Sequence, residues 1–364
     1  MGLAPGWILL CGGLSLVSLG AWGQAPAVGA AASATTEAVK AAATAPTAAA
    51  PEFVLLDTDI GDDIDDAFAL GLVLRSPELK LLGVTTTFGD TDMRARIVDR
   101  YLAAAGHREV AVGAGIPTAQ KNPLTQEPYG RGLSPRRHAD AWVVFSTQVK
   151  AHPGQVTLIA IGPLGNLRNW IERDATTFKL LKRVVVMGGS VKRGYNDVKT
   201  GAEGPASAEW NFLCDPAGAR ALLNSGVPVE LMPLDATQIP LPAEQLQSIL
   251  GRGTAVADQL DILYHQWLAG NEWHMHLPVL YDPMTVASVL DPALCPLEPM
   301  RLDVDEKGFS RQVVGPANVR VCLKADEKSF LKLFGERLDQ PLPPVGEEPA
   351  QRSMMHAAGA ARKM

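Results

Sequence analysis

The sequence predicts an α/β fold with an open, mainly parallel sheet and helices on both faces. Short apolar and β-branched runs, each ending near Gly, Pro or Asp, occur at 53–57, 79–87, 156–161, 183–187 and 227–232. Helical patterns follow at 65–75, 93–105, 167–173 and 216–224. This alternation is typical of βαβ units. Because the strands are apolar along their whole length, we expect a sheet that is buried on both faces.

Composition limits the class of partner. The 364 residues are 47% hydrophobic and 20% charged, which fits one large or two ordinary domains rather than a disordered chain. The formal net charge of −6 gives no basic surface of the kind that binds nucleic acid. We therefore expect a small-molecule partner, with no nucleic acid and no stable membrane partner.

The chain ends differ in composition from the centre. An apolar run from Trp7 to Trp22, followed by small residues, predicts a signal peptide over 1–25 and an exported protein, periplasmic or secreted. An uncleaved anchor is the alternative. The Ala-, Pro- and Thr-rich stretch 26–51 predicts a flexible linker, 52–340 the folded domain, and 341–364 a disordered tail.

Export would leave three cysteines in the mature chain, Cys214, Cys295 and Cys322. Their number is odd and their spacing matches neither a metal site nor a disulfide framework. We expect them to be buried apolar residues.

Acidic residues are concentrated where the chain leaves the first predicted strand. In parallel sheets ligands bind beyond the carboxyl ends of the strands, so this position is the place to look for chemistry. The segment DTDIGDDIDDAFAL carries six carboxylates, at Asp57, Asp59, Asp62, Asp63, Asp65 and Asp66. Such groups raise one another's pKa unless a cation or a helix N-terminus compensates them. Helix capping explains one or two of them, but not Asp57 and Asp59, so we expect a metal or catalytic role.

The type of ligand indicates the type of metal. Oxygen ligands with no His or Cys nearby favour Ca²⁺ or Mg²⁺ over zinc. Calcium takes about 6–8 oxygen ligands, including carbonyls and waters, and suits a site built from several loops.

Five further motifs follow this segment in order: TTTFGD, GPLGNL, VVVMGG, AEWNFLCDP and YDPMTVA. With these motifs the chain, from about residue 53 to 338, resembles the inosine-uridine preferring nucleoside hydrolase family. The resemblance implies that family's single open α/β domain, often a dimer or tetramer. It also implies calcium-dependent hydrolysis of the N-glycosidic bond of ribonucleosides to free base and ribose, as in purine and pyrimidine salvage.

The resemblance also implies a metal site. Asp59, Asp66 and Asp282 match the calcium carboxylates, and Gly165 would supply a backbone carbonyl where the family usually has Thr. Asp59 would also be the general base on the metal-bound water. The acidic segment is two residues longer than the family's shortest form, so whether Asp62 or Asp63 replaces Asp65 stays open.

A second set of residues matches the family's substrate contacts. Glu209, Asn211 and Asp65 match the side chains that hold the ribose hydroxyls. Asp90 stands where the family usually has Asn. Trp210 can stack on a nucleobase, as can Tyr195 and Trp273, although aromatic residues near a cleft are more often part of the core.

Leaving-group protonation is the point where the chain departs from the family. Many members carry a His just before the last aspartate, and this chain has Tyr281 there. A phenol donates a hydrogen bond but transfers a proton less readily than an imidazolium. His274 and His276 are the other candidates for this acid.

Two other functions fit parts of the sequence. A haloacid dehalogenase-like phosphatase would use Asp57 as nucleophile and Asp59 as acid/base. That class also needs a later Lys and a second acidic pair after a strand, and neither is evident in the sequence. It would also leave the AEWN and YDP motifs unexplained. The other alternative is a non-catalytic, exported nucleoside- or sugar-binding protein, against which the presence of Asp59 argues.

Overall fold

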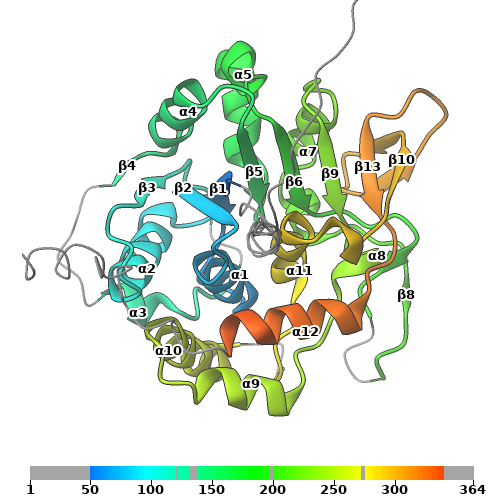
Figure 1. The fold of residues 1–364 in the computed structure, drawn as a ribbon. Coiled ribbons are helices and arrows are strands. Elements are labelled where there is room, and N and C mark those ends of the chain that lie inside the picture. Colours follow the sequence, from blue (N-terminus) through cyan, green and yellow to red (C-terminus); the bar gives the residue numbers. More distant parts are fainter. Residues whose placement is uncertain (1–49, 120–121, 132–137, 197–199, 272–274, 340–364) are drawn as a thin grey trace, which may run out of the picture. The chain divides into compact units, whose positions relative to one another are not determined.

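A nine-stranded sheet, in the order β10-β13-β9-β6-β5-β1-β2-β3-β4, forms the centre of the computed structural model (Figure 1). The structure describes residues 50–119, 122–131, 138–196, 200–271 and 275–339. The central strands are β1 (Glu52–Thr58), β2 (Leu79–Thr86), β5 (Val156–Ala160), β6 (Arg183–Met187) and β9 (Val229–Met232); towards the edges lie β3 (Ala111–Ala114), β4 (Ala139–Asp140), β13 (Val319–Cys322) and β10 (Leu297–Met300).

Neighbouring strands of this sheet are parallel except for the antiparallel pair β10 and β13. The predicted open, mainly parallel α/β fold is therefore confirmed. Two small ribbons accompany the sheet: β7 (Arg193–Gly194) with β8 (Gly204–Pro205), and β11 (Leu302–Val304) with β12 (Ser310–Gln312).

Successive side chains of a strand point to opposite faces of the sheet. Because both sets are apolar here, helices cover both faces. In β1, Val54 and Leu56 join one buried cluster and Leu55 joins the other. Figure 1 shows α4, α5 and α7 on one side and α1, α11 and α12 on the other. These helices are α1 (Asp65–Leu74), α4 (Ala141–Ala151), α5 (Gly165–Phe178), α7 (Pro216–Leu223), α11 (Tyr281–Leu290) and α12 (Glu327–Leu338).

The remaining helices lie between these elements or beside them. They are α2 (Thr91–Ala104), α3 (Glu127–Arg131), α6 (Trp210–Cys214), α8 (Leu234–Thr237), α9 (Ala243–Leu250), α10 (Ala255–Gly270) and the 3-10 helix η1 (Pro292–Leu294). None of the helices in the described ranges has the length and hydropathy needed to cross a membrane. The predicted signal peptide at 1–25, the predicted linker at 26–51 except for its last two residues, and the predicted tail at 341–364 lie outside the described residues.

The predicted burial of Cys295 and Cys322 is confirmed, but the prediction that the cysteines form no disulfide is wrong. Cys295 and Cys322 form a disulfide with their Cα atoms 5.6 Å apart, although they are 27 positions apart in the sequence. Both are buried, and the bond joins the chain after η1 to the end of β13. Cys214, half-buried at the end of α6, lies outside the disulfide.

Candidate active site

A cavity of about 780 Å³ opens at the carboxyl edge of the central strands. Asp59 follows β1, Ile161 follows β5 and Met187 ends β6, so the cavity lies where a parallel sheet is expected to bind its ligand. Seven carboxylates line it, from Asp59, Asp62, Asp63, Asp65, Asp66, Glu209 and Asp282. Its described lining contains neither lysine nor arginine.

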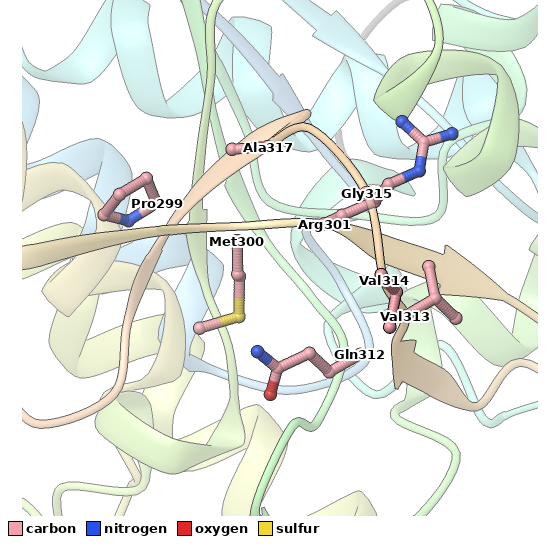
Figure 2. A pocket seen from close by; sticks show the side chains of 8 residues that line it. All are labelled: Pro299, Met300, Arg301, Gln312, Val313, Val314, Gly315 and Ala317. Atoms are coloured by element: carbon pink, nitrogen blue, oxygen red, sulfur yellow. The ribbon is translucent and has the colours of Figure 1, made fainter.

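A second hollow of about 600 Å³ lies beside β10 and β12 (Figure 2). Its lining contains one ionisable side chain, Arg301, and no carboxylate. Figure 2 shows the Arg301 side chain pointing away from Met300 and Gln312. None of the predicted site residues lines this hollow, and its side chains offer no acid–base chemistry.

Three carboxylates in the first cavity can share a metal ion. Asp65 and Asp66, in the first turn of α1, and Asp282, in the first turn of α11, offer oxygen atoms that all lie within 4.8 Å of one another. We call these residues the acidic trio. Burial raises the pKa of each well above its ordinary value, and the neighbouring carboxylates raise it further. A bound cation would relieve this repulsion.

The trio agrees only in part with the metal ligands implied by the resemblance. Asp66 and Asp282 are brought together as expected, but the third member is Asp65 rather than Asp59. The Thr58 hydroxyl donates a short hydrogen bond to Asp66, and the Asp282 backbone N–H donates to Asp65 Oδ2 over 3.3 Å. These contacts hold two members in place.

Asp59 stands beside the trio as a separate buried carboxylate. Its charge contributes to the raised pKa of both Asp66 and Asp282, so it is close enough to interact with them. Burial raises the pKa of Asp59 to about 7, with Arg94 opposing the shift and Asp62 adding to it. Gly162 approaches so closely that a Cβ atom there would lie 2.7 Å from Asp59 Oδ1. A pKa near neutrality suits a general base.

Asp57 lies behind the cavity rather than in it. Its Oδ1 atom accepts hydrogen bonds from the Thr85 hydroxyl at 2.6 Å and from Asn166 Nδ2 at 2.8 Å. Asp57 is fully buried and is not among the lining residues. A phosphatase that used Asp57 as its nucleophile would need this carboxylate in the cavity, so the geometry argues against that alternative.

Asp62 and Asp63, in the same loop, do not belong to the trio. Asp62 forms an ion pair with Arg94, with Oδ2 3.0 Å from Nη2. Asp63 accepts a hydrogen bond from the backbone N–H of Ile64 at 2.7 Å. Asp65, rather than Asp62 or Asp63, therefore belongs to the trio.

Glu209, which precedes α6, and Asn211, in its first turn, line the cavity, and backbone contacts fix both side chains. Glu209 caps the helix: its Oε1 accepts from Asn211 N at 2.8 Å, and its Oε2 accepts from Gly189 N at 2.8 Å and Phe212 N at 3.1 Å. Burial nevertheless raises the pKa of Glu209 to about 7. Asn211 Nδ2 donates to the carbonyls of Ile161 and Met187, both at 3.3 Å.

Aromatic side chains form another wall of the cavity. The rings of Tyr195 and Tyr281 meet edge to face with centroids 6.4 Å apart, and the backbone N–H of Trp210 donates to the Tyr195 hydroxyl over 3.0 Å. Burial raises the pKa of Tyr281 above its ordinary range, and neighbouring acids raise it further, so the phenol keeps its proton. His276 also lines the cavity. Trp273 and His274 lie outside the described residues.

Two predicted site residues do not line the cavity. Asp90 is exposed and caps α2, accepting a hydrogen bond from Met93 N at 3.0 Å. A substrate contact of Asp90 stays a prediction. Gly165 is the first residue of α5, and a Cβ atom at this position would lie nearest to Asp215 and Thr87. Its carbonyl as a metal ligand stays a prediction.

Comparison with solved structures shows the class of fold. A plant nucleoside hydrolase, PpNRh1, matches 80% of this chain and 100% of its own with a TM-score of 0.70 and 24% identity. A purine-preferring ribonucleoside hydrolase from Gardnerella vaginalis matches 79% of this chain and 98% of its own with a TM-score of 0.66, also at 24% identity. The chain therefore has the nucleoside hydrolase fold.

Comparison of sequences shows the family. The pyrimidine-specific ribonucleoside hydrolase RihA of Enterobacter sp. (strain 638) is 28% identical over 318 residues, covering 79% of this chain and 97% of the relative. Uridine nucleosidase 1 of Arabidopsis thaliana is 28% identical over 265 residues, covering 67% and 75%. The model of the inosine-uridine preferring nucleoside hydrolases matches residues 54–332. The chain belongs to this family; it is an N-glycosyl hydrolase that acts on nucleosides.

Proposed function

We propose that the protein hydrolyses ribonucleosides in a calcium-dependent reaction in which Asp59 removes a proton from the attacking water. The observation that carries the proposal is the buried acidic trio next to Asp59, in the same cavity as Glu209 and Asn211. The experiment that tests it is the release of ribose from a panel of purine and pyrimidine ribonucleosides by purified protein. No release from any of them would overturn it.

Calcium fits the donors better than the other common metals. The trio supplies only oxygen atoms. Zinc prefers nitrogen and sulfur ligands, so these donors favour a different metal. Magnesium usually takes one or two carboxylates and keeps several waters, whereas calcium accepts a larger set of protein oxygens. Asp59, Asp66 and Asp282 would hold the ion as the family resemblance implies, and Asp65 is close enough to join them. Bound calcium would lower the pKa of a ligated water.

The other lining residues would bind the two halves of a nucleoside. Glu209 accepts one hydrogen bond at Oε1 and two at Oε2, so Oε1 has room for a ribose hydroxyl. Hydrogen bonds from the sugar to Glu209 and Asn211 can strengthen as the ribosyl group gains positive charge. The base would lie against Tyr195, Trp210 and Tyr281, with the phenol of Tyr281 as hydrogen-bond donor to the leaving group.

The hydroxyl contacts predict discrimination between ribose and deoxyribose. A hydrogen bond to a charged group contributes about 1.5–3 kcal/mol, so 2′-deoxynucleosides are expected to have a kcat/KM about 10- to 100-fold lower. Glu209→Gln is expected to lower kcat/KM for ribonucleosides. It should also bring the kcat/KM values of ribonucleosides and 2′-deoxynucleosides closer together. Glu203→Gln is the matched control, because that side chain is 64% exposed. Equal cleavage of both sugars by the wild type would contradict the assignment.

The leaving-group prediction concerns Tyr281. If its phenol assists departure of the base, Tyr281→Phe is expected to slow inosine about 10-fold or more and to change p-nitrophenyl riboside little, because that leaving group needs no protonation. Steady-state kinetics on both substrates measure the difference. Tyr101→Phe is the control, since Tyr101 is fully buried outside the cavity. Equal losses on both substrates would assign Tyr281 to packing and leave His276 as the described alternative.

We also propose that the protein is exported. The apolar run at the N-terminus supports this, and so does the Cys295–Cys322 disulfide, since disulfides persist mainly in oxidising compartments. N-terminal sequencing of protein recovered from a periplasmic or culture fraction checks the proposal. Recovery only from the cytoplasm, with both thiols reduced, would contradict it.

A further inference from the structure

Arg94, on α2, is a fully buried arginine that reaches under the loop carrying the acidic residues. Its Nε donates to the carbonyl of Phe88 at 2.8 Å. Its Nη1 donates to two consecutive carbonyls, a short bond to Asp59 and one of 3.0 Å to Ile60. Its Nη2 contacts Asp62 Oδ2 at 3.0 Å. One guanidinium therefore ties the end of the second strand to the start of the acidic loop.

The backbone on both sides of this contact is unusual. Phe88 has a φ of 63°, which non-glycine residues rarely adopt, and the bond from Arg94 stabilises its carbonyl in that position. Gly61, in the acidic loop, has a φ of 127°. From the other side, Thr125 Oγ1 donates to the Asp62 carbonyl at 2.7 Å and Gln126 Nε2 to the Asp63 carbonyl at 2.6 Å. The loop that carries Asp59 is held between these two sets of donors.

Asp62 supplies the charge that lets Arg94 be buried. A buried guanidinium requires an ionised partner as well as neutral acceptors. Of the four acceptors named above, Asp62 is the carboxylate and the other three are carbonyls. Asp62 and Asp63 also belong to the longer form of the loop noted in the sequence. An arginine alone would repel a cation in the trio, whereas the ion pair adds no net charge beside it.

We propose that Arg94 is a positioning residue for Asp59, and that Asp62 is its counter-ion rather than a ligand of the metal. The proposal rests on the proposed function and deepens it, because it assigns roles around the base of that reaction. Arg94 fixes the Asp59 carbonyl. The Asp59 side chain is attached to the Cα atom next to this carbonyl, so its position depends on the same contact. Misplacement of a catalytic group by about 1 Å can cost about 100-fold in rate.

The test uses calcium affinity, kcat and melting temperature together. Arg94→Met is expected to lower kcat about 100-fold. Its KM should stay within about threefold, and its calcium affinity should fall less than about tenfold, because only one of the proposed ligands is displaced and the lost Arg94 charge favours the cation. Loosening of the whole site would instead raise KM and weaken calcium as strongly as the loss of a ligand in Asp66→Asn. Arg100→Met is the matched control on the same helix; Arg100 contacts the Tyr129 carbonyl at 2.7 Å and not the acidic loop.

Asp62→Asn separates a counter-ion from a ligand. Its calcium affinity is expected to fall less than about tenfold, from the uncompensated Arg94 charge alone, whereas loss of a ligand in Asp66→Asn should weaken calcium at least about 100-fold. A loss in Asp62→Asn as large as that in Asp66→Asn would overturn the counter-ion assignment. Isothermal titration of calcium into metal-free protein measures both.

The double variant Arg94→Met with Asp62→Asn distinguishes positioning from stability. Removing the unpaired charge should restore the melting temperature towards the wild type while kcat stays low. Recovery of kcat along with the melting temperature would overturn the positioning role. If Arg94→Met alone does not fold, Arg94→Lys keeps the charge but has a single nitrogen for four acceptors, and it should show the same loss of kcat.

Wild-type protein that releases no ribose would refute the proposed function, whereas the calcium titrations would still decide the role of Asp62.

Discussion

Asp59→Asn is expected to lower kcat for ribonucleoside hydrolysis by about 10³- to 10⁴-fold, the upper part of the range for a general base. The amide keeps the size of the side chain and one oxygen, but it cannot take up the proton of the attacking water. KM is expected to change less than kcat, because the ribose contacts proposed for Glu209 and Asn211 remain. The variant should still fold, since Asp59 is held by its backbone carbonyl through Arg94.

The pH profile provides an independent measurement of the same role. Burial raises the pKa of Asp59 to about 7 in the metal-free protein, so the carboxylate is protonated and inactive below that pH. A bound cation favours the ionised form and lowers this pKa. We therefore expect the acid limb of kcat to lie below pH 7 with calcium bound, and to be absent in the residual activity of Asp59→Asn. Asp303→Asn, at an exposed position, is the control. Loss of less than about tenfold in kcat would assign the base to another residue.

The sequence alone could predict the sheet and two carboxylates of the trio. Strand periodicity and the turn residues after each strand are local features, and β1, β2, β5, β6 and β9 were all predicted from them. Asp66 and Asp282 could be paired through the family motifs, although they lie 216 positions apart. No local feature predicted that Asp65, rather than Asp59, would complete the trio.

Residues whose role depends on distant partners could not be predicted. Helical spacing places Arg94 on the same face of α2 as Ile97 and Val98, unlike Arg96 and Arg100, but it does not reveal that the acidic loop packs against this face. Asp90 follows a strand, as a site residue would, yet it caps α2. The Cys295–Cys322 disulfide depends on η1 and β13 meeting, which the spacing of the cysteines does not reveal.

Removal of calcium is expected to abolish hydrolysis and to lower the melting temperature, with a pH dependence that follows from the buried acids. A carboxyl group whose pKa is higher in the folded state stabilises the fold fully only below its unfolded pKa, and this contribution is lost as pH rises through the folded pKa. For Asp59 this stabilisation is lost between pH 3.8, its ordinary pKa, and about pH 7, its raised pKa. Glu209 shifts in the same direction, from 4.5 to about 7. Metal-free protein should therefore be less stable at pH 8 than at pH 5.

Calcium should reverse this trend, because the ion binds the ionised trio and protons compete with it. At a calcium concentration a thousand times Kd, binding adds about 4 kcal/mol to the free energy of unfolding. Melting curves of chelated protein with and without added calcium, at pH 5 and pH 8, should show the larger increase at pH 8. Elemental analysis should find about one calcium per chain. Zinc in that analysis, full activity after exhaustive chelation, or an equal increase at both pH values would contradict a calcium site formed by the ionised carboxylates of the trio.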